Sequence, residues 1–333
     1  MKKFQVVGIG NAMVDVLARA DDSFLAQAGI QKGIMQLIDM DRAVELYGLI
    51  GPAREVSGGS AANTIAGIAH LGGRTAYVGK VKDDQLGTIF AHDMRAQGAV
   101  YETAFAPKDA VDETGRCLVI VTPDGERSMN TYLGVTEFLT VADIDEAQMA
   151  QAEWIYLEGY RFDGPESHAA FAKAIVACKA AGGRVSLTLS DPFCVNRHRE
   201  AFRSMIAADV DLLFCNRAEM LSMYETDDFD AALALAAAEV AVVACTDSAN
   251  GAYILSGPDR WHVPADPVQI VDATGAGDLF AGAFLWALAE NYSLPDCGRI
   301  GNIAAGEVIG HIGARPEQDL KELIAKAGVV PAT

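Results

Sequence analysis

The sequence predicts an α/β protein in which a mainly parallel β-sheet lies between layers of helices and a second, smaller sheet is separate. Short β-branched runs alternate with alanine-rich stretches of helical periodicity, a pattern typical of parallel strands buried between helices. Two strand-rich segments, residues 13–37 and 100–132, interrupt this alternation. The chain is 51% hydrophobic and 21% charged, so it has enough apolar side chains for a large core.

The alternation assigns the core elements in order. Residues 4–8 are expected to form the first strand, and residues 60–71 a helix with apolar residues at helical spacing. Further strand and helix pairs are expected at residues 75–79 with 86–97, 154–158 with 168–181, 184–189 with 199–208, and 212–215 with 231–238. Strands at 240–245 and 253–255 follow, and a long helix begins near Asp278 with Thr274 as its expected N-cap.

The two strand-rich segments are expected to pair into a small β-sheet lid. In the second segment, the sequence PDGE at residues 123–126 is typical of a hairpin turn. A small sheet above the ends of the core strands can close over a bound substrate. The predicted parts are an α/β core that holds the catalytic site, residues 1–12, 38–99 and 133–333, and a lid over the substrate, residues 13–37 and 100–132.

Composition excludes several classes of partner. With 26 Lys and Arg against 45 Asp and Glu, the net charge is −19, which argues against binding nucleic acid or an anionic membrane surface. The longest apolar stretch, residues 279–289, is shorter than the roughly 20 residues that span a bilayer. Six scattered cysteines without a CxxC pair are typical of free thiols in a reducing compartment. We therefore expect a cytoplasmic protein with small-molecule partners, as a monomer or a homodimer.

The sharpest motif is DATGAGD, from Asp272 to Asp278, followed directly by a helical pattern. Gly275, Ala276 and Gly277 have little or no side chain, so a ligand could reach their backbone N–H groups at a helix N-terminus, which favours an anion. Asp278, about one turn into the helix, could accept the proton of an attacking hydroxyl during phosphoryl transfer. Alternatively, Asp272 and Asp278 only cap the helix and the glycines allow tight packing.

The motif resembles the second signature of the PfkB (ribokinase-like) carbohydrate kinase family, usually D-T-x-G-A-G-D. Other family elements occur in the same order over nearly the whole chain. They are GIGN at residues 8–11 with Asp15, GGSAAN at 58–63 with Ala66 and Leu71-Gly72, Asp84 with Gly87, and Asn216-Arg217-Ala218-Glu219. The resemblance implies a ribokinase-like three-layer α/β/α core with a small β-sheet lid. It also implies ATP-dependent transfer of the γ-phosphoryl group to a hydroxymethyl of a sugar-like substrate.

The resemblance also implies roles for particular residues. Asp278 would be the base, and Gly275, Ala276 and Gly277 an anion hole, with Arg127 of the lid adding positive charge on closure. The remaining matches imply substrate contacts from Asn11, Asp15, Gly59 and Asn63, nucleotide contacts from Asn216, Thr246, Gly251 and Asn302, and a magnesium contact through water from Glu219. ATP and Mg²⁺ are thus implied, and a monovalent cation such as K⁺ remains open. From the residues alone, Asn216 and Glu219 could instead form a helix capping box, and Asn302 a cap.

Three positions depart from the family pattern. Ala273 stands where Thr is common, and Lys82 where Gly usually precedes Asp84. Ser248 replaces the first Gly of the nucleotide-contacting T-x-G-x-x-G, so a side chain stands where the family's nucleotide approaches the backbone closely.

Within the family, the adenosine kinase branch is the most similar. The similar segments are Met35-Gln36, RSMNTYL at residues 127–133, and the run from Ala304 through GARP at residues 313–316. A nucleoside needs apolar walls around its base, which Met35, Met129, Tyr132 and Leu133 could supply. The expected acceptor is the 5′-hydroxyl of adenosine, with Gln36 at the substrate.

Other functions are alternatives to a nucleoside kinase. A sugar kinase of the same family, of the fructokinase or ribokinase type, is the main one, and a non-catalytic ligand-binding relative is a remote one. A dinucleotide-dependent oxidoreductase is disfavoured because GIGNAMVD, residues 8–15, lacks the third glycine of that fingerprint.

Overall fold

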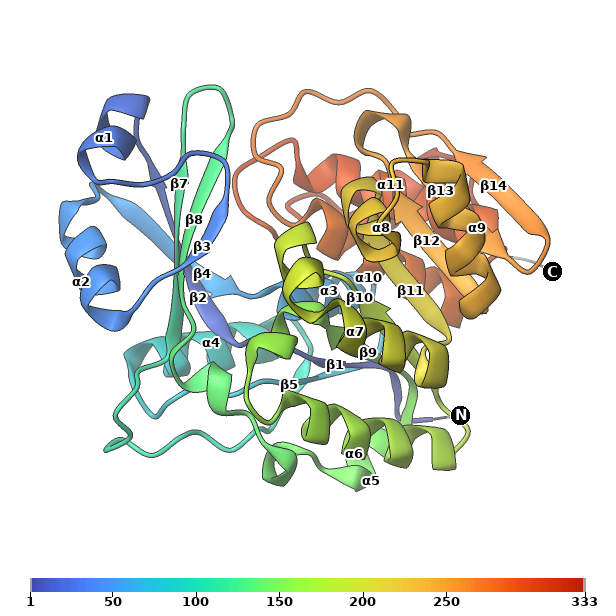
Figure 1. The fold of residues 1–333 in the computed structure, drawn as a ribbon, viewed down its shortest axis with the longest axis horizontal. Coiled ribbons are helices and arrows are strands. Elements are labelled where there is room, and N and C mark those ends of the chain that lie inside the picture. Colours follow the sequence, from blue (N-terminus) through green and yellow to red (C-terminus); the bar gives the residue numbers. More distant parts are fainter. Residues whose placement is uncertain (1, 332–333) are drawn as a thin grey trace.

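The computed structural model describes residues 2–331, which form two β-sheets and the helices around them (Figure 1). In spatial order, the large sheet contains β14 (Asp259–Val263), β13 (Ala252–Ser256), β12 (Val242–Thr246), β11 (Leu212–Asn216), β10 (Arg184–Thr188), β9 (Ala152–Glu158), β1 (Phe4–Ile9), β5 (Thr75–Val78) and β6 (Val100–Tyr101). The seven strands from β12 to β6 are parallel, and β13 and β14 are antiparallel to their neighbours. The predicted mainly parallel sheet is confirmed.

Helices cover both faces of the large sheet. One face packs on α5 (Glu146–Ala150), α6 (Ser167–Ala180), α7 (Pro192–Asp209), α8 (Arg217–Tyr224) and α9 (Phe229–Glu239). The other packs on α3 (Ser60–His70), α4 (Gln85–Ala96), α10 (Ala276–Ala289), α11 (Leu294–Val308) and α12 (Leu320–Lys326). Two large apolar clusters fill the space on the two sides, which gives the predicted three-layer α/β/α fold.

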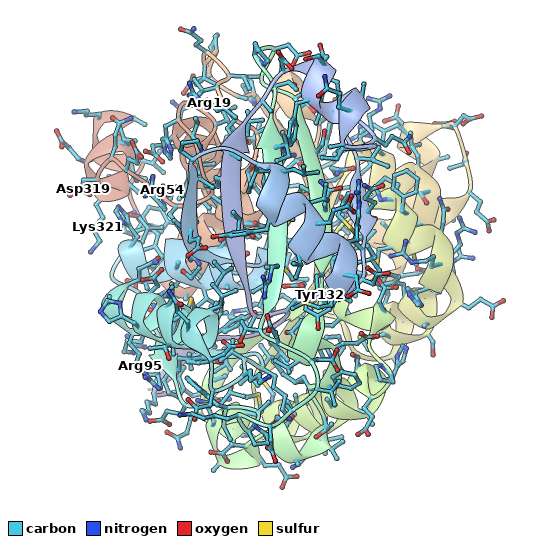
Figure 2. All side chains as sticks on the ribbon, turned by 90° about the vertical axis from the view of Figure 1, so that its left-hand side faces the viewer. Arg19, Arg54, Arg95, Tyr132, Asp319 and Lys321 are labelled. Atoms are coloured by element: carbon cyan, nitrogen blue, oxygen red, sulfur yellow. The ribbon has the colours of Figure 1, made fainter. Side chains whose placement is uncertain are left out.

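The small sheet lies beside the core, at the left of Figure 1. Its strands, in order, are β3 (Met35–Leu37), β8 (Arg127–Tyr132), β7 (Gly115–Val121), β2 (Met13–Arg19) and β4 (Ala53–Gly58). Two helices, α1 (Asp22–Gln27) and α2 (Met40–Leu49), lie in front of these strands in the view of Figure 2. Buried residues of these helices, Leu25 and Leu46, pack with Val16, Leu118 and Ile120 on that face.

The opposite face of the small sheet is also apolar and faces the core. Met13, Leu17, Cys117, Val119 and Val121 form a cluster there. Ile312, which comes from the loop after α11, packs against this cluster. We call this face the inner face, because it meets the core, and the face under α1 and α2 the outer face.

Two strands fall outside the parts that the sequence predicted for them. β4 belongs to the small sheet, although residues 38–99 were predicted as core, and β6 belongs to the large sheet, although residues 100–132 were predicted as lid. β4 pairs with β2, and β6 pairs with β5. The residues of a short strand do not indicate which of two sheets it joins, because this depends on its partner elsewhere in the chain. The PDGE turn does join β7 to β8, with Gly125 at φ +81°.

The described residues contain no helix both long and apolar enough to cross a membrane.

Candidate active site

The predicted site residues gather at the carboxyl ends of the parallel strands. Asn11 follows β1, Asn216 ends β11 and Thr246 ends β12. Glu158, for which the sequence predicted no role, ends β9 at the same edge. In open α/β sheets this edge is where ligands bind, because the loops that leave it converge there. The small sheet is connected at the same edge, because β1 continues through residues 10–12 directly into β2.

The N-terminus of α10 provides the predicted glycine turn. Gly275 is its N-cap, with φ +79° and no side-chain cap, so the prediction that Thr274 caps this helix is wrong. A Cβ on Gly275 would lie 2.6 Å from the Cβ of Ala314, whereas a Cβ on Gly277 would meet no atom within 4 Å. Gly277 is exposed, so a ligand can reach the first N–H groups of the helix.

Asp278 lies in the first turn of α10 and is held from α3. Its Oδ1 accepts a hydrogen bond from the Ser60 hydroxyl at 2.7 Å, and its Oδ2 accepts one from Asn63 Nδ2 at 2.9 Å. Burial raises the pKa of Asp278 above its ordinary value, while these two hydrogen bonds act to lower it. A carboxylate with a raised pKa at a helix N-terminus is well suited to exchange a proton.

Asp272 fixes the geometry of the glycine turn. Its fully buried carboxylate accepts hydrogen bonds from the backbone N and the hydroxyl of Thr274 and, at 2.9 Å, from the backbone N of Gly313. Arg127 of β8 reaches the same carboxylate, with its Nε 4.0 Å from Oδ1. Asp272 thus connects the turn to the loop after α11 and to the small sheet.

Asp15 lies on the inner face of the small sheet beside Gly58, where a Cβ would collide with its carboxylate at 2.2 Å. No hydrogen-bond donor among residues 2–331 reaches this carboxylate, so its oxygens are free for a ligand. Burial, with the charge of Asp278 adding to it, raises the pKa of Asp15 to about 7 against the opposing effect of Arg315. Arg315 donates to the carbonyls of Ala62 and Ser57 at 2.8 and 3.0 Å.

Asn11 lies within a buried polar network. Glu158, 1% exposed, accepts from the backbone N of Asn11 at 3.3 Å and from that of Ala61 at 2.8 Å. Burial raises the pKa of Glu158 to about 7. Arg161, also 1% exposed, donates to Oδ1 of Asn11 at 3.0 Å. Gly59 has φ +97°, and a Cβ there would lie 2.2 Å from the carbonyl oxygen of Asn11.

Asn216 and Glu219 form a capping box at the start of α8. The Asn216 side chain accepts from the backbone N of Glu219 at 2.9 Å, and the Glu219 carboxylate accepts from the backbone N of Asn216 at 2.9 Å. Burial, then the charges of Asp191 and Asp278, raise the pKa of Glu219 to about 7. The helix capping box that the sequence left as an alternative therefore forms. The negative charge of Asp278 also acts on Glu219 and raises its pKa.

Thr246, Gly251 and Asn302 lie together at one end of the large sheet. Thr246 pairs with the residue after Gly251, and a Cβ on Gly251 would lie 2.1 Å from the carbonyl oxygen of Val263. Asn302, in the middle of α11, donates to the same oxygen at 2.9 Å. It therefore does not cap a helix, and it connects α11 to β14.

Replacing Ser248 with glycine should stabilise the protein. Ser248 adopts φ +50°, a conformation that costs a non-glycine residue about 1–2 kcal/mol. We expect Ser248→Gly to raise the free energy of unfolding by up to about 1 kcal/mol in urea, since glycine loses some of the gain as chain entropy. The matched variant Ser204→Gly, at an exposed position inside α7, should lower it by about 0.5 kcal/mol, the difference in helix propensity between serine and glycine. A loss of stability in Ser248→Gly would contradict this account.

The structure does not bring Gln36 to the other predicted site residues. Gln36 pairs with Asn130, whose neighbour across the sheet is Leu118 of the outer face. Its amide donates to Oδ1 of Asn130 at 2.6 Å. Since paired residues of adjacent strands share a face, Met35, which pairs with Met129, lies on the inner face instead.

Four residues of the site received no role from the sequence. Ser60 adjoins the predicted Gly59 and Glu158 ends an apolar strand, so motif position and a charge at a strand end could have indicated them. Arg315 lies in the GARP segment, whose similarity to the adenosine kinase branch assigned it no role. Arg161 left no motif signal, and the partners of these two arginines, Asn11 and Ala62, are 150 and 253 residues away in the chain.

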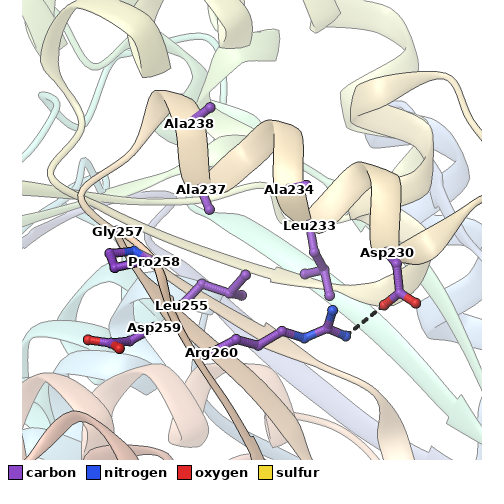
Figure 3. Close-up of a pocket in the computed structure, with 10 residues that line it drawn as sticks. All are labelled: Asp230, Leu233, Ala234, Ala237, Ala238, Leu255, Gly257, Pro258, Asp259 and Arg260. Carbon is purple, nitrogen blue, oxygen red and sulfur yellow. Dashed lines mark hydrogen bonds and ion pairs between the residues drawn. The ribbon is translucent and has the colours of Figure 1, made fainter.

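A separate cavity of about 350 Å³ lies between α9 and the β13–β14 turn, next to the ion pair of Arg260 and Asp230 at 2.7 Å (Figure 3). None of the predicted site residues lines it.

Fold and site together define a ribokinase-like kinase, a phosphotransferase whose acceptor is a hydroxyl group. The sequence model described as "pfkB family carbohydrate kinase" matches residues 33–320, and the chain belongs to this family. The protein is thus a carbohydrate or nucleoside kinase, and its family implies the use of ATP and usually Mg²⁺.

Solved and curated relatives include both acceptor classes. The adenosine kinase of Sinorhizobium meliloti is 48% identical, with a TM-score of 0.93 over 98% of this chain and 99% of that one. A "probable sugar kinase protein" from Rhizobium etli CFN 42 is 47% identical, with a TM-score of 0.95 over 99% and 100% of the two chains. A curated fructokinase from Vibrio alginolyticus is 27% identical over 70% of this chain and 77% of its own length.

Proposed function

We propose that the protein transfers the γ-phosphoryl group of ATP to the 5′-hydroxyl of a purine nucleoside, most specifically adenosine. The observation that carries the phosphoryl-transfer chemistry is the position of Asp278. It lies in the first turn of α10, beside reachable backbone N–H groups, with both carboxylate oxygens held by α3. The 48% identity to an adenosine kinase supports the choice of acceptor.

Asp278 acts as the base in this proposal. It accepts the proton of the acceptor hydroxyl as the oxygen attacks the γ-phosphorus, and the bond to the β-phosphate oxygen breaks. The N–H groups of Gly275, Ala276 and Gly277 stabilise the negative charge that develops on the transferring group. Each well-placed donor of this kind contributes about 3 kcal/mol. Arg127 adds positive charge when the small sheet, acting as a lid, closes over the substrate.

Residues around Asp278 suit a magnesium ion held largely by phosphates and water. Within residues 2–331, no three or more His, Cys, Asp or Glu side chains form a group that could hold a metal ion. Mg²⁺ usually keeps several waters and binds through one or two carboxylates and substrate phosphates. The raised pKa of Glu219 indicates a site where nearby positive charge would be favourable. Mg²⁺ bound with ATP would neutralise phosphate charge, and Glu219 would hold one of its waters. ATP would contact Asn216, Thr246, Gly251 and Asn302 in this proposal.

The acceptor lies between the inner face and the core. Asp15 offers free carboxylate oxygens to ribose hydroxyls, as acceptors of their protons. Asn11, Gly59 and Asn63 surround the same space from the core. The buried Oδ1 of Asn63 has no partner within the described chain and can accept from a further hydroxyl. Met129 and Leu133, packed on the inner-face cluster, provide apolar surface for a base.

A sugar kinase is the second candidate, favoured by the 27% identity to a fructokinase. The deciding experiment measures ATP consumption with adenosine, inosine, guanosine, fructose and ribose. We expect adenosine to give the highest kcat/KM. Turnover of a free sugar without turnover of adenosine would overturn the nucleoside assignment and leave the kinase assignment intact. We further propose a cytoplasmic location, supported by six cysteines that are all free and buried.

Ser60 should set the pH dependence of the reaction. Its hydrogen bond favours ionised Asp278 and lowers that pKa, so Ser60→Ala should raise it. Because the base must be ionised, activity falls as the pH drops through this pKa. The acid limb of the kcat/KM profile should therefore move to higher pH in Ser60→Ala, with rates approaching wild type at high pH. Ser293→Ala, which removes the exposed N-cap of α11, should leave the limb in place. An unmoved limb in both variants would contradict the role of Ser60.

A further inference from the structure

Arg161 lies where the core meets the small sheet. It belongs to a short 3₁₀ helix, Gly159–Asp163, directly after β9, and it is 1% exposed. Burial lowers its pKa, and the charge of Glu158 opposes this effect. A buried arginine needs hydrogen-bond acceptors for its N–H groups, so its hydrogen bonds show which segments of the chain it connects.

Its contacts hold together two crossings of the chain between the sheets. Nη1 donates to Oδ1 of Asn11, in the crossing from β1 to β2, and at 2.5 Å to the carbonyl of Thr136, in the crossing that follows β8. The two crossings also contact each other, because the backbone N of Ala12 donates to the Thr136 hydroxyl at 2.8 Å. On the other side, Nη2 donates to the Ser167 hydroxyl at 2.7 Å.

The guanidinium determines which end of the Asn11 amide reaches the substrate. Arginine has only donors, so the amide atom that faces it must be the oxygen. The amide nitrogen Nδ2 then has no protein partner within the described chain and is not sealed from solvent. Asn11 consequently presents a donor to the acceptor site, while Asp15, two residues after Met13 on the inner face, presents acceptors. A hydroxyl between them can donate to Asp15 and accept from Asn11.

We propose that Arg161 is a positioning residue that fixes Asn11 as a hydrogen-bond donor to one hydroxyl of the phosphoryl acceptor. Arg161 itself touches no substrate; it acts through the orientation of the Asn11 amide. Without it, the amide can rotate and present its oxygen beside the Asp15 carboxylate, where two acceptors would face one hydroxyl. The inference rests on the proposed kinase function but holds for a nucleoside or a sugar acceptor.

The test is the kinetics of Arg161→Lys, which keeps the charge but loses the planar fork. We expect the KM for adenosine to rise at least about tenfold, as for a lost hydrogen bond to a buried polar group, with the KM for ATP changed less than about twofold. Ser167→Ala is the matched control, since it removes a contact of Arg161 on the side away from Asn11. Its KM values should stay within about twofold of wild type.

Deoxynucleosides separate a positioning role from a merely structural one. If Asn11 donates to one ribose hydroxyl, Arg161→Lys should lose its effect on KM with either 2′-deoxyadenosine or 3′-deoxyadenosine, whichever lacks that hydroxyl. Asn11→Asp, which keeps a partner for Arg161 but removes the donor, should show the same loss of effect with the same analogue.

Two results would overturn the proposal. One is an equal rise in KM for adenosine and both deoxynucleosides, and the other is a rise for ATP as large as that for adenosine. If wild type does not phosphorylate adenosine, the proposed acceptor is wrong. The same comparison then uses the sugar that turns over and its deoxy analogues, so failure of the acceptor assignment is seen separately from failure of the Arg161 proposal.

Discussion

Asp278→Asn should lower kcat by about 10²–10⁴-fold, the usual contribution of a general base. The amide has nearly the same shape, and its oxygen can still accept from Ser60. Its NH2 group can donate to the unpartnered Oδ1 of Asn63 once that amide turns over, but it cannot take the proton of the attacking hydroxyl. ATP binding depends on other residues, so its dissociation constant by calorimetry should change less than about threefold. The measurement is steady-state phosphorylation of the best acceptor from the substrate panel, with product identified directly rather than by ATP loss alone.

The matched control is Asp259→Asn, the same substitution at the exposed aspartate that begins β14 (Figure 3). It should keep wild-type kcat, which excludes a general effect of removing one negative charge from an acidic protein. Phosphorylation by Asp278→Asn within tenfold of wild type would remove Asp278 as the base. The carboxylate would then act only as a helix cap, the alternative that the sequence left open.

Gly275→Ala should be the second large effect, because it distorts the anion hole without removing a polar group. The added Cβ would lie 2.6 Å from Cβ and 2.9 Å from Cα of Ala314, closer than real Cβ contacts, in a residue with φ +79°. Either the turn or the Ala314 loop must shift. We expect kcat to fall by about 10²–10³-fold, as when a donor to a developing anion is lost, and the free energy of unfolding to fall by at least about 1–2 kcal/mol.

Gly182→Ala separates the two effects. Gly182 has φ +75°, nearly the same conformation, but a Cβ there meets no atom within 4 Å, and it lies in the turn between α6 and β10. This variant should lose stability from backbone strain and keep wild-type kcat. If Gly275→Ala also keeps its kcat while losing no more stability than Gly182→Ala, the turn at α10 does not stabilise the transferring group.

Local patterns predicted the large elements, and long-range pairing decided the details. The alternation of strands and helices and the DATGAGD motif placed the sheet, α10 and Asp278 correctly. Which residue of the motif caps α10 depends on the positive φ of Gly275 and the hydrogen bonds of Thr274 to Asp272, which side-chain type alone does not determine. Gln36 was misplaced for a similar reason, since a shift of one residue along a strand moves a side chain to the other face.

Buried charges were the hardest part of the site to predict. Asn216 and Glu219 fit both a capping box and a ligand site, and only their mutual hydrogen bonds show that the capping box forms. Arg161 and Arg315 occur singly in the sequence, and their importance depends on contacts with Asn11 and Ala62 from other elements. Sequence patterns identify polar residues that lie close together in the chain, whereas each of these arginines meets its partner only in the folded structure.

The carboxyls of Asp15, Glu158 and Glu219, each with its pKa raised to about 7, also affect how stable the enzyme is without ligands. A carboxyl whose pKa is higher in the folded than in the unfolded chain stabilises the fold when it is protonated. This contribution is fully present below the pKa of the unfolded chain and is lost as the pH rises through the folded pKa of about 7. At neutral and alkaline pH, the free energy of unfolding of the ligand-free protein is therefore lower than at acidic pH, as far as these three carboxyls determine it. This loss of stability accompanies the burial of carboxylates that can bind hydroxyls and a cation. Binding of the substrates would raise the free energy of unfolding again.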